Sequence, residues 1–446
     1  MVRWQYVPDE DLLCRVGARR RVDVSLLFRS SKATREVNRQ INFFMLSDMF
    51  SRCIFITTII VLFFQQYGLS FAAIMLVSAI EGAITFVFEI PSGMLADAWG
   101  RKKTVLTGML LGIIGLLCYI IHPSFIVFVI AEILLAIGSS FESGASQAII
   151  YGKFEKHNIT GEFRSYITRK SRLMPLATSI TLLSASALFS FNSYLPFYLS
   201  IFFMSLSFVL FYFVDDDQEK DARDAVRPED ATKSKFTAGV RDGFLAIFKN
   251  KKLLTLTLCS AYLITMYSNI AYLSQVYLLD LGLPLKLMGI FYFVYHLLSS
   301  ISASYSERLF KTFSMNRFLV FLLFMCISTA MLSIELLFLA MPLYLIFAFI
   351  NDVISQTINS EIPALTDEVN RATVMSIVSA IQGFFGLFFE PLLGLLIDHV
   401  GISMMYLVLG LGTSVIVLLA LLYQYVRLGM SAVTADPKRS AEDGVS

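Results

Sequence analysis

An acidic and a basic residue stand four residues apart inside the first long apolar stretch of the sequence. In a helix, Asp48 and Arg52 would share one face, where they can form an ion pair. A charged side chain at the centre of a bilayer costs at least about 2.5 to 3.5 kcal/mol on insertion scales. The pair either only offsets that cost or binds a substrate or a proton, and Arg52 can instead pair with Glu81. We therefore take Asp48 and Arg52 as candidates for a coupling or substrate cavity.

Further carboxyl groups lie well inside apolar stretches. A carboxyl group without water around it can bind and release a proton at physiological pH, which makes each one a candidate proton carrier. For any single residue, a structural hydrogen bond is the more common role, but the set predicts at least one group that titrates. These residues are Glu81, Glu132, Glu142 and Glu390.

Two polar features occur in the second part of the chain. His296 follows Tyr295, and its imidazole either titrates in the physiological range or serves only in packing. Asp352, Gln356 and Asn359 recur at helical spacing and form one polar stripe. In lipid, such a stripe must face protein or a water-filled cavity. We expect Asp352 and Gln356 to line the cavity.

The sequence lacks the motifs of the common enzyme classes. It contains no G-x-x-x-x-G-K-[ST], no G-x-S-x-G and no H-E-x-x-H, so neither ATP hydrolysis nor a catalytic centre is indicated. It has only four histidines, and its cysteines lack the spacing of metal ligands, so neither a metal site nor a disulfide framework is indicated. The net charge of +2 gives no reason to expect nucleic-acid binding. We expect no enzyme activity, cofactor or metal.

Long apolar segments must position these side chains. The chain is 56% hydrophobic and 16% charged, with a mean hydropathy of +0.69, whereas soluble domains are about 25% charged. A helix needs about 20 residues to cross the hydrocarbon core. We therefore predict an all-α integral membrane protein with twelve transmembrane helices. Their ranges are 41–64, 71–91, 104–122, 124–150, 171–191, 194–214, 253–279, 285–305, 317–337, 338–361, 373–397 and 402–427.

A polar stretch divides these helices into two sets of six, and a weak repeat relates the sets. Gly93 and Asp97 after the second helix are matched by Ala303 and Glu307 after the eighth. Parallel six-helix halves with a substrate site between them are a known transporter plan. The predicted parts are a basic tail at 1–40, a six-helix bundle at 41–214, a cytoplasmic linker at 215–252, a second bundle at 253–428 and a tail at 429–446.

The basic residues predict the topology. If the predicted helices cross the membrane in alternating directions, all of the 36 Lys and Arg residues except Arg52 and Lys286 lie on one side of the membrane. The positive-inside rule makes that side the cytoplasm, with both termini there. Residues 1–40 lack the apolar core of a cleavable signal peptide, so we expect the first helix to be retained. The compact loops favour a multi-pass protein of a bacterial inner membrane.

The most specific motif follows the second helix, where residues 89–106 read EIPSGMLADAWGRKKTVL. Glycines there permit close helix approach and a tight turn, while the aspartate can pair with cations or face a helix N-terminus. The basic residues either anchor topology or form a charge pair that biases a two-state equilibrium. The candidate conformational gate consists of Gly93, Asp97, Gly100, Arg101 and Lys102.

This stretch resembles the signature of the major facilitator superfamily, G-x-L-A-D-x-x-G-R-K-x-x-L, at every anchor. It departs at Ala98, where many members carry a basic residue. The resemblance implies a secondary transporter whose two halves rock around a central cavity. The EIPSG-x-LAD-x-x-GRK form is similar to members assigned to drug or metabolite efflux. However, helix 124–150 lacks the arginine of many efflux members, and helix 171–191 lacks the G-P-x-x-G-G-like run of drug and proton antiporters.

We therefore predict a transporter that exports a small molecule, a drug or a metabolite, by proton-coupled alternating access. The antiported proton would bind Asp48, Glu81 or Glu142, and the partners would be the substrate, a proton or other coupling ion, and the lipid bilayer around a monomer. One alternative is a carrier of the same family for a siderophore, sugar, peptide or lipid-like metabolite, import included. Another is a transport-inactive membrane sensor or assembly partner.

Overall fold

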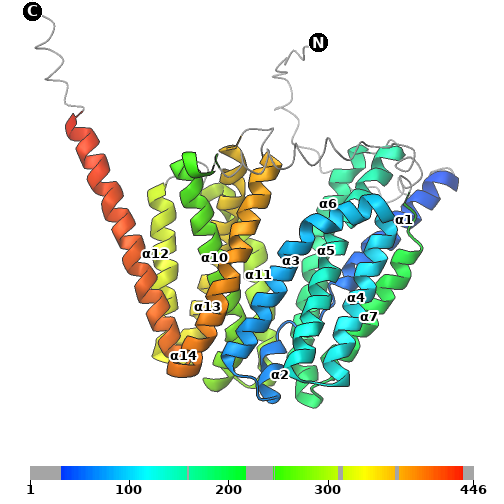
Figure 1. Cartoon of the computed structure of the whole chain (residues 1–446), viewed down its shortest axis with the longest axis horizontal. Coiled ribbons are helices and arrows are strands. Elements are labelled where there is room, and N and C mark those ends of the chain that lie inside the picture. Colours follow the sequence, from blue (N-terminus) through cyan, green and yellow to red (C-terminus); the bar gives the residue numbers. More distant parts are fainter. Residues whose placement is uncertain are drawn as a thin grey trace, which may run out of the picture.

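The computed structural model describes residues 32–157, 160–216, 245, 247–309, 315–366 and 371–434, and the regular structure in these ranges is helical (Figure 1). The first half contains α1 (Lys32–Ser51), α2 (Ile60–Gln66), α3 (Phe71–Trp99), α4 (Arg101–Ile121), α5 (Phe125–Lys156), α6 (Thr160–Phe191) and α7 (Leu195–Tyr212). The second half contains α10 (Lys251–Asp280), α11 (Leu285–Leu309), α12 (Met315–Met331), the short 3₁₀ helix η3 (Leu332–Ile334), α13 (Leu337–Ala364) and α14 (Arg371–Thr434).

The helices have the lengths that a bilayer requires. Eight helices of the described ranges are long and apolar enough to span a membrane, and two shorter apolar helices cover Leu285–Leu298 and Phe318–Ile334. One of the eight, α14, bends sharply at Gly401, whose φ of 84° suits glycine, and so makes two crossings. With the α1–α2 segment, these helices confirm the predicted fold of twelve helices in two six-helix bundles.

The two bundles form a V (Figure 1). They are joined where α3 packs against α14 and α6 packs against α11. The beginning of α1 and the end of α14 lie on the wide side of the V, and the bend of α14 lies on the narrow side. Contacts between the halves therefore concentrate toward one end, while the other end is spread apart.

The bend of α14 brings a glycine and an aspartate against the start of α3. A Cβ on Gly394 would lie 2.6 Å from the Cα of Ala72, so only glycine permits this approach. One turn on, the two carboxylate oxygens of Asp398 accept hydrogen bonds from the backbone N–H groups of Phe71 and Ala72, at 2.8 and 2.9 Å. These N–H groups have no partner within their own helix. Gly394 and Asp398 thus link the two halves at this end of α3.

The structure corrects the first predicted membrane helix and shows that another is part of a longer helix. The first membrane segment is interrupted between Ser51 and Ile60, instead of forming one helix over 41–64. Helix α6 begins at Thr160, but its apolar span is Leu173–Phe191, close to the predicted 171–191. Its polar first part can extend beyond the hydrocarbon core. Residues 1–31, 217–244 and 435–446 lie outside the described ranges, so the linker and the tails remain predictions.

Candidate functional site

The interruption between α1 and α2 places non-helical backbone within a membrane-crossing segment. The N–H group of Phe55 donates to Ser200 Oγ of α7 at 2.8 Å. From the other half, Gln275 of α10 accepts from the N–H group of Val61 at 3.1 Å and donates to the carbonyl of Thr57 at 2.9 Å. Irregular backbone at membrane depth is tolerated only inside protein or beside a water-filled cavity. Side chains of both halves therefore stabilise this break.

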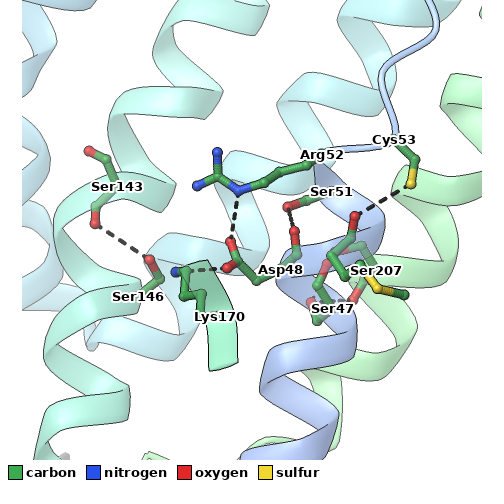
Figure 2. Close-up of polar contacts among 10 residues, drawn as sticks. Ser47, Asp48, Ser51, Arg52, Cys53, Ser143, Ser146, Lys170 and Ser207 are labelled. Carbon is green, nitrogen blue, oxygen red and sulfur yellow. Dashed lines mark hydrogen bonds and ion pairs between the residues drawn. The ribbon is translucent and has the colours of Figure 1, made fainter. Parts of the chain in front are cut away.

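A cluster of ionisable residues, which we name the charged site, lies where α1 ends (Figure 2). Asp48 of α1 forms two ion pairs: its Oδ2 lies 2.7 Å from Lys170 Nζ of α6, and its Oδ1 lies 3.6 Å from Arg52 Nε. The side chain of Arg52 is 53% exposed, against 26% for Lys170 and 19% for Asp48. The predicted pair of Asp48 and Arg52 is present, and the alternative pair of Arg52 with Glu81 is not among the ion pairs of the described chain.

Glu142 of α5 completes the charged site. Its carboxyl group is close enough to interact electrostatically with both Asp48 and Arg52, although it forms no ion pair with either cation in the ranges described. Tyr166 of α6 is buried beside Asp48, and its hydroxyl group has no hydrogen-bond partner within those ranges. Helices α1, α5 and α6, with the residue that follows α1, thus contribute two cations, two carboxyl groups and a hydroxyl group without a described hydrogen-bond partner.

Lys170 was missed by sequence reasoning, which assigned it to a loop. The signal that could have found it is the helical spacing of the buried residues around it. Tyr166, Met174 and Thr181 are buried on one face of α6, and Lys170 falls four residues from both Tyr166 and Met174. A basic residue in phase with a buried apolar face predicts a cation that points into the bundle.

A second group, which we name the carboxyl cluster, consists of Glu81 of α3, Glu132 of α5 and Glu390 of α14. Glu132 and Glu390 each lie close enough to Glu81 to interact electrostatically, and Tyr272 of α10 lies close to all three. Tyr119 of α4 donates a hydrogen bond to Glu132. Within the described residues, no lysine or arginine forms an ion pair with any of the three. The cluster unites carboxyl groups from both halves of the protein.

A cavity of about 300 Å³ adjoins this cluster between α3, α10 and α14. Its polar lining includes Glu89 of α3, Thr265 and Ser268 of α10, and Gln382 and Glu390 of α14. The cavity therefore lies between the two halves, and each half contributes polar groups to its wall.

Glu390 is the carboxyl group that joins the cluster to the cavity. Ser78 of α3 and Asn269 of α10 lie beside its carboxylate. Its Oε2 atom is nevertheless buried without a hydrogen-bond partner in the described ranges. A buried oxygen without a donor is costly, unless a proton or a ligand satisfies it. Glu390 is thus suited to bind a proton at the boundary between the halves.

The polar stripe of the second half is present on α13. Asp352 accepts a hydrogen bond from Ser302 of α11 at 3.4 Å, and Gln356, one turn further, is exposed. His296 of α11 is partly buried, with its ring 5.5 Å from that of Tyr295. The side chain of Asn359 lies outside the described residues. The exposure of Gln356 is compatible with a stripe that lines a cavity.

The gate motif lies on the wide side of the V. Gly100 separates α3 from α4 with a φ of 99°, and Lys102 Nζ lies 4.0 Å from Asp215 Oδ1 at the end of the first half. A Cβ on Gly93 would meet no atom of the described residues within 4 Å, so the close helix approach predicted there is not seen among them in this conformation. The side chain of Asp97 lies outside the described residues. The motif is thus not engaged with the second half through Gly93.

Comparisons with known proteins agree with this architecture. A family model described as the Major Facilitator Superfamily matches residues 41–359. The uncharacterized MFS-type transporter YxaM of Bacillus subtilis is 21% identical over 358 residues, which cover 78% of this chain and 87% of YxaM.

Two solved structures are similar in fold. The nucleoside transporter NupG is 12% identical, with a TM-score of 0.71, over 87% of this chain and 99% of NupG. A bacterial homolog of the human lysosomal transporter Spinster, in an inward-facing and unoccupied conformation, is 15% identical with a TM-score of 0.62, over 88% of this chain and 96% of the homolog.

Proposed function

Because the chain belongs to the major facilitator superfamily, whose members are transporters and not enzymes, we propose that it exports a small molecule by proton-coupled alternating access. It is a multi-pass membrane protein, and in our proposal it lies in a bacterial inner membrane as a monomer, with the wide side of the V facing the cytoplasm. The observation that carries the proposal is the carboxyl cluster, which both halves build beside the cavity between them.

The cluster can link protons to movement of the halves. Like charges at short distance disfavour each other, so three carboxyl groups without a cation retain protons more readily when they are close together. Glu81 and Glu132 belong to the first half, and Glu390 belongs to the second. Rocking of the halves changes the separation of these groups, and hence the number of protons bound. Proton binding and conformation then influence each other reciprocally.

The conformation supports alternating access with export. The narrow side is closed by the hydrogen bonds of Asp398 to the start of α3, and the wide side carries the beginning of α1 and the end of α14 (Figure 1). With the predicted topology, the open side faces the cytoplasm, where an exported molecule would enter. Closure of the wide side would bring the gate motif near the second half.

Transport in proteoliposomes tests this proposal. A thermal-shift screen of a metabolite library on the purified protein first identifies a ligand, which is then radiolabelled for flux measurements. We expect an imposed pH gradient to drive its flux, and we expect Glu390→Gln to abolish the dependence on that gradient. Glu335→Gln, at an exposed carboxylate on the turn between η3 and α13, is the matched control. If the flux through the wild-type protein does not depend on the pH gradient, the proposed proton coupling is wrong.

A further inference from the structure

Among the described residues, Arg52 uses few of its hydrogen-bond donors. A guanidinium group has five N–H donors in a planar fork. Only the Nε atom of Arg52 approaches Asp48, at 3.6 Å, which is longer than a hydrogen bond. The two terminal nitrogens point away from Asp48 (Figure 2). The side chain is 53% exposed even though it lies in a membrane-crossing segment.

A structural role alone does not explain this geometry. Arginine and carboxylate groups that only neutralise each other prefer two parallel hydrogen bonds. Here Lys170 occupies one oxygen of Asp48 at 2.7 Å and leaves Arg52 a single long contact. Asp48 is thus shared by two cations. Because Glu142 forms no ion pair with either cation in the described chain, the guanidinium group keeps its terminal donors available.

We propose that Arg52 and Lys170 bind the carboxylate or phosphate group of an anionic organic substrate. This inference rests on the proposed transport function, because it assigns the chemical class of the molecule that is carried. The terminal nitrogens of Arg52 match the two oxygens of a carboxylate or phosphate, and Lys170 adds a point charge. The break after α1 supports this assignment, since transporters build substrate sites at the unwound parts of discontinuous helices.

The neighbouring groups suit the exchange of partners that binding requires. When Lys170 turns toward an incoming anion, Asp48 loses its shortest contact. The Tyr166 hydroxyl group, buried beside Asp48 without a partner in the described chain, is then available to donate to it. On α5, Ser143 and Ser146 lie on the side toward which the guanidinium group of Arg52 points (Figure 2). Charged and hydroxyl groups from α1, α5 and α6 therefore lie near Arg52.

Matched pairs of anions and neutral analogues test the inference on the purified full-length protein. The probes are benzoate with benzamide, hexanoate with hexanamide, and glycerol 3-phosphate with glycerol, and binding is measured by thermal shift and titration calorimetry. We expect at least one anion to stabilise the protein while its neutral analogue does not. Preference for the carboxylates or for the phosphate ester distinguishes the two sources of the anionic group.

Variants then locate the binding. Arg52→Gln should weaken anion binding at least about tenfold, in keeping with the loss of a charge-assisted hydrogen bond, and Arg52→Lys should restore only part of it, because the fork is lost. Lys286→Gln is the matched control, because it also removes a positive charge but at the start of α11, where Lys286 lies over the ring of Phe191. Unfolding without ligand verifies that each variant is folded.

Three results would overturn the inference: equal binding of an anion and its neutral analogue, unchanged affinity in Arg52→Gln, or no binding by any of the anions. The outcome is separate from that of the proposed function. If a bound anion is transported without regard to a pH gradient, the proton coupling fails while the anion site stands. If a neutral molecule is transported by the gradient, the anion site fails while the coupling stands.

Discussion

At the scale of single residues, the charged site depends on one carboxylate that serves two cations. Asp48 contacts both Lys170 and Arg52, and its side chain is only 19% exposed. Removal of one partner from a buried ion pair is costly because the remaining charge is left without compensation. The three residues therefore differ in how much each contributes to stability.

Asp48→Asn should destabilise the protein by about 1 to 3 kcal/mol, since it leaves two cations without their shared carboxylate. Lys170→Gln should cost less, because Arg52 remains to pair with Asp48. The double variant should be more stable than Asp48→Asn alone, since one unpaired cation has been removed. Thermal unfolding of the three variants in detergent measures this order. A larger loss for Lys170→Gln than for Asp48→Asn would contradict the shared-carboxylate account.

Sequence spacing alone predicted part of this site. Asp48 is in the last turn of α1 and Arg52 directly follows the helix, so their pairing could be expected from their separation of four residues. Lys170 comes from α6, and the sequence around it does not indicate which other helix it faces. Likewise, each carboxyl group of the cluster was a candidate by itself, but only the packing of α3 and α14 shows that Glu81 and Glu390 interact.

At the scale of helices, the junction of α3 with α14 joins the two halves on the narrow side. Gly394 permits the backbones to approach, and Asp398 satisfies the free N–H groups of Phe71 and Ala72. A carboxylate at a helix N-terminus is also favoured by the helix dipole. Side chains added at this junction should therefore favour the conformation in which the narrow side is open.

Gly394→Val should shift the protein toward that conformation, because the new side chain would clash with the backbone of Ala72. The readout is the labelling of a single cysteine at Ala72 by a membrane-impermeant maleimide, which should become several-fold faster. Gly412→Val is the matched control on α14, where a Cβ would meet no atom within 4 Å. Equal labelling rates in Gly394→Val and Gly412→Val would show that this junction does not control closure.

Sequence patterns predicted the bend of α14 better than the break after α1. The helices expected at 373–397 and 402–427 flank Gly401, where the positive φ occurs. The break between Ser51 and Ile60 has an apolar sequence, CIFITTI at 53–59, that reads as a continuous membrane helix. Its backbone partners, Ser200 and Gln275, are distant in sequence. Such a break depends on tertiary contacts that periodicity does not contain.

At the scale of the whole molecule, composition and charge distribution were enough to predict the two bundles, but not the conformation. The same lengths of apolar helix fit a conformation in which the wide ends are apart and one in which they are close together. The conformation follows from contacts between the halves, including the carboxyl cluster. When its members lose their protons, repulsion between Glu390 and the carboxyl groups of the first half disfavours the arrangement seen here. A rise in pH should therefore favour the alternative conformation.

The distance between the wide ends of the two halves tests the coupling of protons to conformation most directly. Spin labels at Lys103→Cys of α4 and Lys251→Cys of α10, both exposed, report this distance in a protein without its native cysteines. Between about pH 5.5 and 8.5, we predict that the population with the long distance decreases in the wild-type protein and stays constant in Glu390→Gln. A distance distribution that is the same at both pH values in the wild-type protein would contradict the account.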